Sequence, residues 1–289
     1  MFLLDICIIT LNTREKNEMT LNYVKFLDFV RFCNENSINE SDYSIAKSLI
    51  LHVSDINEMT ISDIAEEANS SVASVSRFIR KMGFQSLNEF RTKMPRDKNN
   101  YQNLMNMLFI KSNGFLNDGQ IENSLINEAL DNLKSTISIL DDSKINQLID
   151  MIFESRSISL LGDTREVRTF YTFQLGLMML NKPVFAFTNS EIAIHHLSMM
   201  KEGDTVIYFV LAKEWLTDSM KKKLCNAYQK GAKIVIFTQD ELEDDVKAEL
   251  IISYGKPGSH NNGYYSLTFL CDLIYSLIMN RNPEFHSSN

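Results

Sequence analysis

The stretch from Thr60 to Gly83, TISDIAEEANSSVASVSRFIRKMG, constrains the fold of this chain more than any other part of its sequence. Thr60 and Asp63 have the spacing of a capping box, in which a hydroxyl and a carboxylate accept backbone N–H groups at the start of a helix. Apolar residues then recur at helical spacing, at Ile61, Ile64, Ala65 and Ala68. We therefore predict a short helix with one apolar face.

A tight turn and a second helix follow. Asn69 tolerates the left-handed conformation that turns a chain sharply, and Ser71 has a side chain suited to cap a helix. The expected buried stripe of this helix is Val72, Val75, Ile79 and Met82. Gly83 is the expected stop. Because the small Ala65 allows close crossing and Val75 fills the angle, the pattern predicts a helix-turn-helix.

The outward face of the second helix offers hydroxyl and guanidinium groups, which bind base edges and phosphates. We predict double-stranded DNA as a partner, with Ser71, Ser74 and Arg77 near bases and Arg80, Lys81 and Arg91 on phosphates. A helical hairpin with a solvated basic face has the same periodicity and stays open as the alternative.

Charge supports a localised DNA site. The formal net charge of −8 argues against a protein that coats nucleic acid indiscriminately. Between Ser71 and Lys98, however, seven Lys and Arg residues face only two acidic residues. This positive patch on an acidic chain is typical of a DNA reader with a separate regulatory domain.

Cysteine and histidine usage indicates neither a metal nor a cofactor. The four cysteines are scattered, without a C-x-x-C pair, at Cys7, Cys33, Cys225 and Cys271. His195 and His196 are adjacent, so on a helix they point about 100° apart and make a poor metal pair. No apolar run reaches the length of a membrane span, and we expect a cytoplasmic protein with reduced thiols.

The first half of the chain predicts an all-helical head. We treat residues 1–18 as an extra or poorly ordered segment, with Met19 as an alternative start. Residues 20–36 and 41–53 have helical apolar stripes and precede the helix-turn-helix. Ser86 and Glu89 form an S-x-x-E box that opens a last helix, which Pro95 ends. The head is therefore placed at 19–95 and the linker at 96–119.

The second half changes period. Two helices are expected first, at 120–140 (with the stripe Ile121, Leu125, Ala129, Leu133, Ile137 and Leu140) and at 143–155. Apolar strands follow at 158–162, 183–187, 204–210, 232–237 and 248–255. They alternate with helices at 164–180, 190–200, 216–230 and 264–279. This alternation predicts a doubly wound α/β domain with a five-stranded parallel sheet over 120–282, and a tail at 283–289.

The segment SSVASVSRFIRKMGFQSLNEFR, ahead of this α/β half, resembles the RpiR-type transcriptional regulators. The resemblance covers roughly residues 20–280. It implies a helix-turn-helix domain joined to a flavodoxin-like SIS (sugar isomerase) domain that senses phosphosugars, and control of sugar or amino-sugar metabolism genes.

The effector loops depart from the pattern that this resemblance implies. The family's G-x-G-x-S falls on Gly162-Asp163-Thr164-Arg165-Glu166, and its S-x-S-G falls on Val210 to Lys213. Glu166 replaces a phosphate-binding serine, and both hydroxyls of the second loop are missing. His260 lies in the 255–263 loop, which either closes over the cleft or is a flexible connection. The candidate effector residues are Gly162, Thr164, Arg165, Glu166, Lys213 and His260.

We therefore expect a DNA-binding regulator that is a homodimer or homotetramer, not an enzyme, with a carbohydrate-derivative or other small-molecule effector. Two alternatives stay open. One is a sugar-phosphate isomerase that uses Glu166 or His260 as its base. The other is a constitutive regulator whose α/β domain only dimerises.

Overall fold

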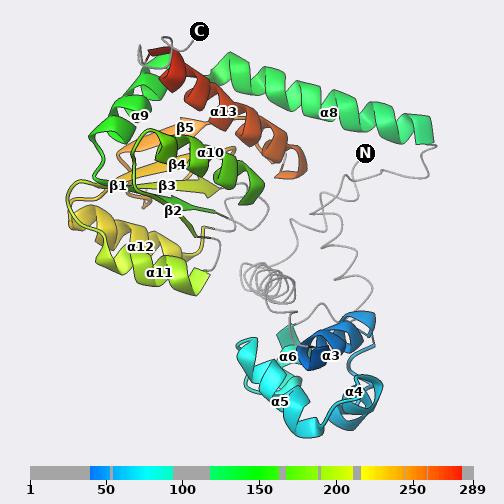
Figure 1. Cartoon of the computed structure of the whole chain (residues 1–289). Coiled ribbons are helices and arrows are strands. Elements are labelled where there is room, and N and C mark those ends of the chain that lie inside the picture. Colours follow the sequence, from blue (N-terminus) through cyan, green and yellow to red (C-terminus); the bar gives the residue numbers. More distant parts are fainter. Residues whose placement is uncertain are drawn as a thin grey trace. The chain divides into compact units, whose positions relative to one another are not determined.

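The computed structural model describes residues 40–52, 55–93, 118–162, 167–187, 190–210, 216–243, 245–258 and 260–281 (Figure 1). The chain divides into two compact units, Met1–Phe109 and Ile110–Asn289, and each is described by itself. The division falls inside the expected linker. The expected helix at 20–36, the 1–18 segment and Pro95 lie outside the described residues, and the domain limits stay predictions.

The described head consists of four helices around one core. They are α3 (Glu40–Leu51), α4 (Ile61–Glu67), α5 (Val72–Lys81) and α6 (Leu87–Lys93). The core is apolar and includes Ile45, Leu49, Ile64, Val75, Phe78 and Phe90. At the start of α6 the hydroxyl of Ser86 accepts the Glu89 N–H at 3.1 Å, and the Glu89 carboxylate accepts the Gln85 N–H at 2.6 Å. The predicted S-x-x-E box therefore forms, with its carboxylate bonded one residue earlier than expected.

The predicted buried stripe of α5 is wrong at one position. Val72 is 43% exposed, whereas Phe78, which the stripe omitted, is 2% exposed. At about 100° per residue the buried face runs from Phe78 through Val75 to Ile79, and Val72 lies beyond its edge in the first turn. The first turn of α5 therefore presents an apolar side chain to solvent.

The second unit is a doubly wound α/β domain, as predicted. Its helices are α8 (Asp118–Ile139), α9 (Asp142–Glu154), α10 (Val167–Met179), α11 (Ser190–Met199), α12 (Asp218–Gln229) and α13 (His260–Arg281). Its strands are β1 (Ser157–Leu161), β2 (Val184–Phe187), β3 (Asp204–Val210), β4 (Lys233–Thr238) and β5 (Leu250–Ser253). All pairings are parallel, in the order β2-β1-β3-β4-β5. The four-residue strands β2 and β5 form the two outer edges.

Successive residues of a strand pack into two separate hydrophobic cores, because their side chains point alternately to the two faces of the sheet. Ile207 and Phe209 of β3 pack with α9, α10 and α13, whereas Val206 and Tyr208 pack with α11 and α12. Figure 1 shows these helices on opposite faces of the sheet. Burial on both faces explains why the strands have continuous apolar sequences.

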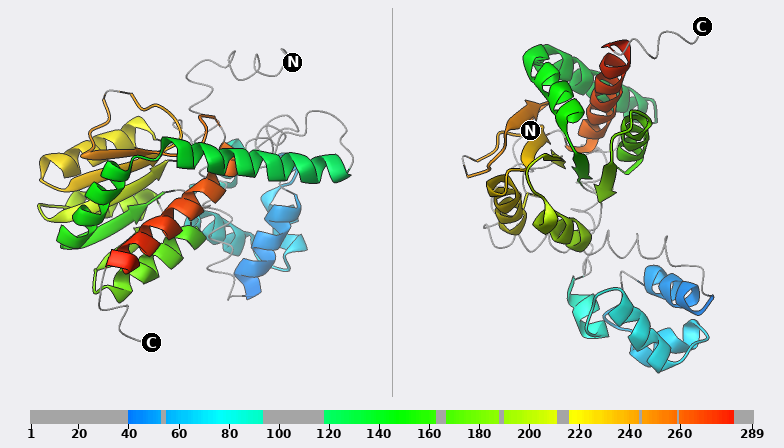
Figure 2. Two further views of the ribbon diagram at one scale, coloured as in Figure 1. Left: turned by 90° about the horizontal axis from the view of Figure 1, so that it is seen from above. Right: turned by 60° about the vertical axis from the view of Figure 1, so that its left-hand side comes forward.

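Helix α8 forms near its predicted bounds, but its predicted apolar stripe is not buried. Ile121 is 39% exposed, Leu125 is 40% exposed and Ile137 is 60% exposed. The buried positions are polar instead, since Asn132 and Thr136 are fully inaccessible. The physical reason is that α8 packs along α13, and its N-terminal part extends past that helix (Figures 1 and 2).

The last helix begins earlier than predicted. Helix α13 starts at His260 rather than Tyr264, so the end of the expected 255–263 loop is helical. Gly255 and Gly258 have left-handed backbones, with φ of 66° and 72°, and make the turn before it. His260 is therefore a helix N-terminal residue and not part of a loop over a cleft.

Candidate DNA-binding surface and effector edge

The crossing of α4 and α5 is fixed by local hydrogen bonds that match the predicted ones. The Thr60 hydroxyl accepts the Asp63 N–H at 3.2 Å, and the Asp63 carboxylate accepts the Thr60 N–H at 2.6 Å. These hydrogen bonds from Thr60 lower the pKa of Asp63. Asn69 turns the chain in the left-handed region, with φ of 46°, and Gly83 follows α5 with φ of 87°. Local interactions between Thr60 and Gly83 thus determine the helix-turn-helix geometry.

The three residues predicted to approach bases lie together on one side of α5. The Ser71 hydroxyl caps the helix by accepting the Ser74 N–H at 3.1 Å. The two serine hydroxyls are 3.0 Å apart, and Arg77 donates from Nη2 to the Ser74 hydroxyl at 3.1 Å. Ser71 therefore has a structural role in addition to the base contact predicted for it.

The three residues predicted to hold phosphates have different environments. Arg80 is exposed on α5. Lys81 pairs with the Asp42 carboxylate of α3, with Nζ and Oδ2 2.8 Å apart. The half-buried Arg91 donates from Nε to the Ile56 carbonyl at 3.0 Å and from Nη2 to the Met59 carbonyl, which ties α6 to the segment before α4. Phosphate contact stays a prediction for all three.

The first turn of α3 lies beside α5, which sequence reasoning missed. A surface hollow of about 340 Å³ separates them and is lined by Ser41, Asp42, Ser74, Arg77, Phe78 and Lys81. The hydroxyls of Ser41 and Ser70 are 3.3 Å apart beside it. Helical periodicity predicts where each helix lies in the sequence but not which helices pack together. The sequence therefore gave no indication that Asp42 lies beside Lys81.

A histidine links α3 to α4 elsewhere in the head. His52 places Nδ1 3.3 Å from the Asp55 carboxylate and Nε2 3.0 Å from the Glu67 carboxylate. Glu67 also accepts the hydroxyl proton of the buried Ser48 at 2.8 Å. The hydrogen bond with Asp55, followed by the contacts with Glu67, raises the pKa of His52 above its ordinary value, against the opposing effect of burial.

In the α/β domain, the two predicted effector loops follow neighbouring strands. β1 ends at Leu161 and β3 ends at Val210, and these strands pair side by side. The strand order reverses between them, and ligands of doubly wound sheets bind at such a switch point, outside the carboxyl ends of the strands. Half-buried Gly162 directly follows β1. Thr164, Arg165, Glu166 and Lys213 lie outside the described residues, and for His260 only the helical backbone is described.

A buried polar cluster at the carboxyl ends of β4 and β5 was also missed. The Asn132 amide donates to Gln239, which follows β4, at 3.4 Å, and Ser266 of α13 donates to the Asn132 oxygen. The Thr136 hydroxyl accepts the Gly255 N–H at 2.9 Å. These contacts fix the C-terminal half of α8 against the edge of the sheet where the strands end.

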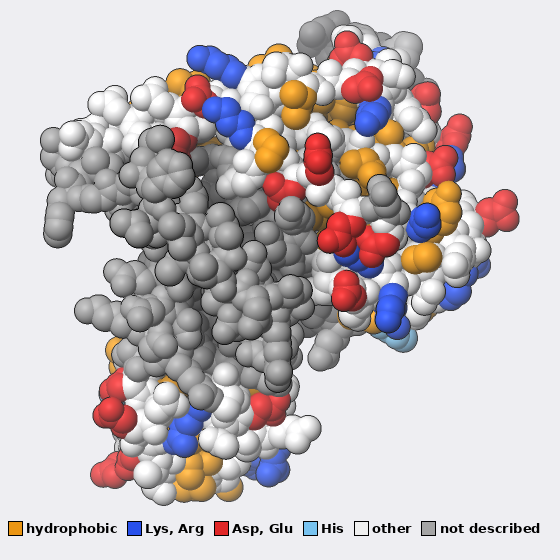
Figure 3. Space-filling view, turned by 180° about the vertical axis from the view of Figure 1, so that it is seen from behind, with side chains coloured by type: hydrophobic (Ala, Val, Ile, Leu, Met, Phe, Trp, Pro, Cys, Tyr) orange, Lys and Arg blue, Asp and Glu red, His pale blue; other side chains and the backbone are white. Residues whose placement is uncertain are grey.

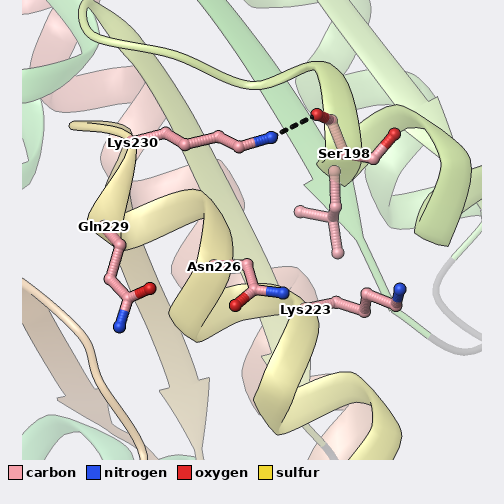
Figure 4. Close-up of a pocket in the computed structure, with 6 residues that line it drawn as sticks. Ser198, Lys223, Asn226, Gln229 and Lys230 are labelled. Atoms are coloured by element: carbon pink, nitrogen blue, oxygen red, sulfur yellow. Dashed lines mark hydrogen bonds between the residues drawn. The ribbon is translucent and has the colours of Figure 1, made fainter.

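A shallow hollow of about 200 Å³ lies between α11 and α12 (Figure 4). Lys230 points across it and donates to the Ser198 carbonyl at 2.7 Å, and the lining also includes Lys223, Asn226 and Gln229. The hollow lies toward the C-terminal ends of both helices, which in an α/β unit return to the amino edge of the sheet. It is therefore separate from the switch point at the carboxyl ends of β1 and β3.

His196 lies in a packed environment. Its Nε2 is 2.8 Å from the buried Ser159 hydroxyl, and its ring is 4.3 Å from the Phe187 ring. Burial lowers the pKa of His196, a shift that the nearby Asp204 opposes. Across the described ranges, no three His, Cys, Asp or Glu side chains are grouped to hold a metal, and no helix is long and apolar enough to cross a membrane.

The charged side chains of the two units differ in arrangement. On the face of the α/β unit in Figure 3, acidic and basic side chains are interspersed. In contrast, α5 carries Arg77, Arg80 and Lys81, and no acidic residue stands between Ser71 and Gly83. A one-signed helix face of this kind is an electrostatic footprint for nucleic acid.

Comparison with known proteins gives relatives for both units. Residues 33–100 match the helix-turn-helix domain of the rpiR family. The chain is 22% identical over 197 residues to a helix-turn-helix-type transcriptional regulator of Providencia stuartii, covering 68% of each protein. It is 21% identical over 249 residues to one of Clostridium perfringens, covering 81% of this chain and 86% of the relative.

A solved structure shares the fold. The chain is similar to the Vibrio vulnificus NanR protein complexed with ManNAc-6P, with a TM-score of 0.51, 17% identity, and coverage of 90% of this chain and 94% of that one. The sugar isomerase domain of an RpiR transcription factor from Sphaerobacter thermophilus aligns with a TM-score of 0.49 and 17% identity, over 57% of this chain and 93% of that one.

Proposed function

We infer that this chain is an RpiR-type helix-turn-helix transcriptional regulator with a SIS-type α/β domain, and that α5 reads operator DNA in the major groove. One observation carries the proposal. Caps at both ends fix α5 in a helix-turn-helix, and its exposed side carries Ser74, Arg77 and Arg80 without an acidic residue.

Arg77 is the residue that we assign to base reading. It lies on the Ser71–Ser74 side of α5, within the helix and about one and a half turns from its N-terminus. Guanidinium groups discriminate bases by about 1–3 kcal/mol per good contact. Arg77→Ala should therefore relax sequence preference, whereas Lys81→Ala should mainly reduce affinity for operator DNA and its salt slope by about one unit. Lys47→Ala, on an exposed position of α3, is the charge-matched control.

The test is binding of the purified protein to its own upstream DNA and to random duplex across a salt series. Operator preference that Arg77→Ala lowers, and Lys47→Ala leaves intact, supports the assignment. Equal losses for Arg77→Ala on both duplexes refute the base-reading role. If the upstream DNA shows no preference, sequences selected from random DNA replace it, because an operator need not lie upstream.

We also propose that the chain acts as a homodimer through α8, since one small head makes few base contacts and two heads read half-sites about one helical turn apart. An apolar stripe with spacings of four, three and four residues runs along α8: Ile126, Leu130, Leu133 and Ile137. Ile126 is 58% exposed, Leu130 is 45% exposed and Ile137 is 60% exposed. This spacing fits knobs-into-holes packing against the same helix of a second copy.

Leu130→Glu should weaken this association without unfolding the domain, because the side chain is exposed. Equilibrium sedimentation at micromolar concentration measures it, with Tyr171→Glu, an exposed position of α10, as control. A wild-type monomer refutes the model. A dimer that Leu130→Glu leaves intact moves the interface elsewhere, and a tetramer indicates a second interface.

For the α/β domain we propose a sensor of a small molecule at the β1–β3 switch point. Support comes from the pairing of β1 and β3, the strands that the two loops follow in sequence, and from the fold shared with a protein whose structure holds ManNAc-6P. The Thr164, Glu166 and Lys213 substitutions argue that a phosphosugar binds in an altered mode, or that another ligand has replaced it. A ligand of the folded state raises the melting temperature. A phosphosugar panel without such a shift, and without effect on DNA binding, favours the scaffold role.

We further propose that the chain is not an enzyme and acts in the cytoplasm, where DNA is accessible to it. The curated relatives are named as regulators, and neither loop carries the phosphate-anchoring residues that the family resemblance implies. Turnover of any phosphosugar that is lost in Glu166→Gln would contradict this.

A further inference from the structure

We propose that Asp42 is a specificity-determining residue of the DNA-binding surface, which keeps Lys81 away from phosphates on random DNA. The proposal rests on DNA binding through α5 and extends the contact surface to the first turn of α3. Its ligand is duplex DNA whose base edge offers an amino hydrogen to a carboxylate.

The contacts place Asp42 within the predicted contact surface. The hollow between α3 and α5 is lined by Ser74, Arg77 and Lys81, which are three predicted DNA contacts, together with Ser41 and Asp42. Lys81 Nζ is 2.8 Å from Asp42 Oδ2, and the lysine side chain is 51% exposed while the aspartate is 20% exposed. A carboxylate therefore lies where phosphates or base edges must approach.

Phosphate binding by Lys81 has a consequence for Asp42. When the ammonium turns to a phosphate, the Asp42 carboxylate loses its partner beside a polyanion, and electrostatic repulsion opposes binding. A cytosine or adenine amino group in the major groove restores a hydrogen bond to the carboxylate, and acidic side chains accept from cytosine N4. Asp42 thus disfavours most sequences and tolerates a subset.

A purely structural role makes a different prediction. An exposed ion pair between two helices stabilises a fold by about 0–1 kcal/mol and does not affect DNA binding by itself. If Asp42 only fastens α3 to α5, its removal loosens the head and weakens all DNA binding. If it restrains Lys81, its removal strengthens binding to random DNA. The two readings differ in sign.

The experiment measures affinity of the full chain for random and operator-selected duplexes of about 30 base pairs, long enough for two half-sites. Asp42→Asn removes the charge and keeps the shape. Glu40→Gln removes a charge from the same exposed turn, outside the residues that line the hollow. Lys81→Ala and the Asp42→Asn/Lys81→Ala double variant complete a double-mutant cycle.

We expect Asp42→Asn to raise affinity for random duplex roughly tenfold at about 0.1 M salt and to steepen the salt slope by about one unit, as for one added phosphate contact. Affinity for the selected duplex should rise less, so that the specificity ratio falls. The double variant should bind random duplex like Lys81→Ala alone.

Three results would overturn the proposal. The first is random-duplex affinity that Asp42→Asn leaves unchanged or lowers. The second is an equal rise in Glu40→Gln, which assigns the effect to net charge. The third is a rise that persists in the Lys81→Ala background. If wild-type protein and every variant fail to bind any duplex, the proposed function itself fails, and this inference fails with it.

Discussion

Val72 offers a test of how the head contacts DNA, because the periodicity of the sequence predicts that its side chain is buried, whereas the structure shows it exposed. The side chain is 43% exposed in the first turn of α5, the part of a recognition helix that contacts base edges. An exposed apolar side chain at this position matches the thymine methyl group, which lies in the major groove. We predict that Val72 contacts such a methyl in the operator.

The magnitude follows from the exposed fraction. Full burial of a valine contributes about 1.5–3 kcal/mol, so covering the 43% that is exposed contributes about 0.6–1.3 kcal/mol per head. Val72→Ala should then weaken binding to a selected operator about three- to ninefold per head. A dimer with both heads engaged should show about the square of that factor. Binding to random duplex should change little.

The assay pairs the protein change with a change in the DNA. Replacing each operator thymine in turn by deoxyuridine deletes one methyl, which is worth about 0.8 kcal/mol when buried. At the contacted position Val72→Ala and the thymine replacement should be non-additive. Additive effects at every thymine, or equal losses on random duplex, would refute the contact.

Hydrogen exchange of the α5 amides supplies the stability control. Val72→Ala should leave protection nearly unchanged, since alanine is the better helix former and no core contact is lost. Val75→Ala, at a position with no exposed surface, should destabilise the head by about 2 kcal/mol and speed exchange roughly thirtyfold. Equal destabilisation by both changes would indicate that Val72 is buried, as the periodicity of the sequence predicted.

Three further predictions concern stability. Because the pKa of His52 is raised from its ordinary 6.5 in the folded head, its stabilising effect is complete below that value and is lost as pH rises through the folded pKa. Wild type should therefore lose stability over this range relative to His52→Gln, as measured by denaturant titration; parallel pH profiles would contradict this. Asp204 is 2% exposed and accepts hydrogen bonds from Arg156 at 2.7 Å, from Ser157 and from the Lys201 N–H, so Asp204→Ala should lower the free energy of unfolding by about 2 kcal/mol in urea titrations. The exposed Asp218→Ala should leave it nearly unchanged, and equal losses in the two variants would contradict this. Gly263→Ala puts a methyl group 1.9 Å from the Gln239 amide nitrogen and should lower the melting temperature. A second change, Gln239→Ala, should restore part of the loss, whereas an unchanged melting temperature in Gly263→Ala would show that the Gln239 side chain moves aside.

The features that were predicted correctly depend on interactions between residues close together in the sequence. The Thr60–Asp63 box, the left-handed Asn69 and the Gly83 stop each depend on residues within one or two turns, so the sequence states them directly. The parallel sheet was likewise predictable, because burial on both faces demands uninterrupted apolar strands such as 204–210.

The parts that were missed depend on which elements become neighbours. Nothing in the spacing of Asp42 indicates that α3 begins beside Lys81, or that Asn132 of α8 meets Gln239 after β4. The buried polar face of α8 misled periodicity for the same reason, since Asn132 and Thr136 are buried by hydrogen-bonding partners that lie far away in sequence.

The shortness of the outer strands has a consequence for the dimer proposed above. β2 and β5 each provide four residues, compared with seven in the central β3. An unpaired strand edge is a template for edge-to-edge aggregation, and a short edge gives an incoming strand few ladder hydrogen bonds. If the chain forms the proposed dimer, contact between copies is thereby directed to side chains on the helices, where it forms and dissociates without exchange of backbone hydrogen bonds.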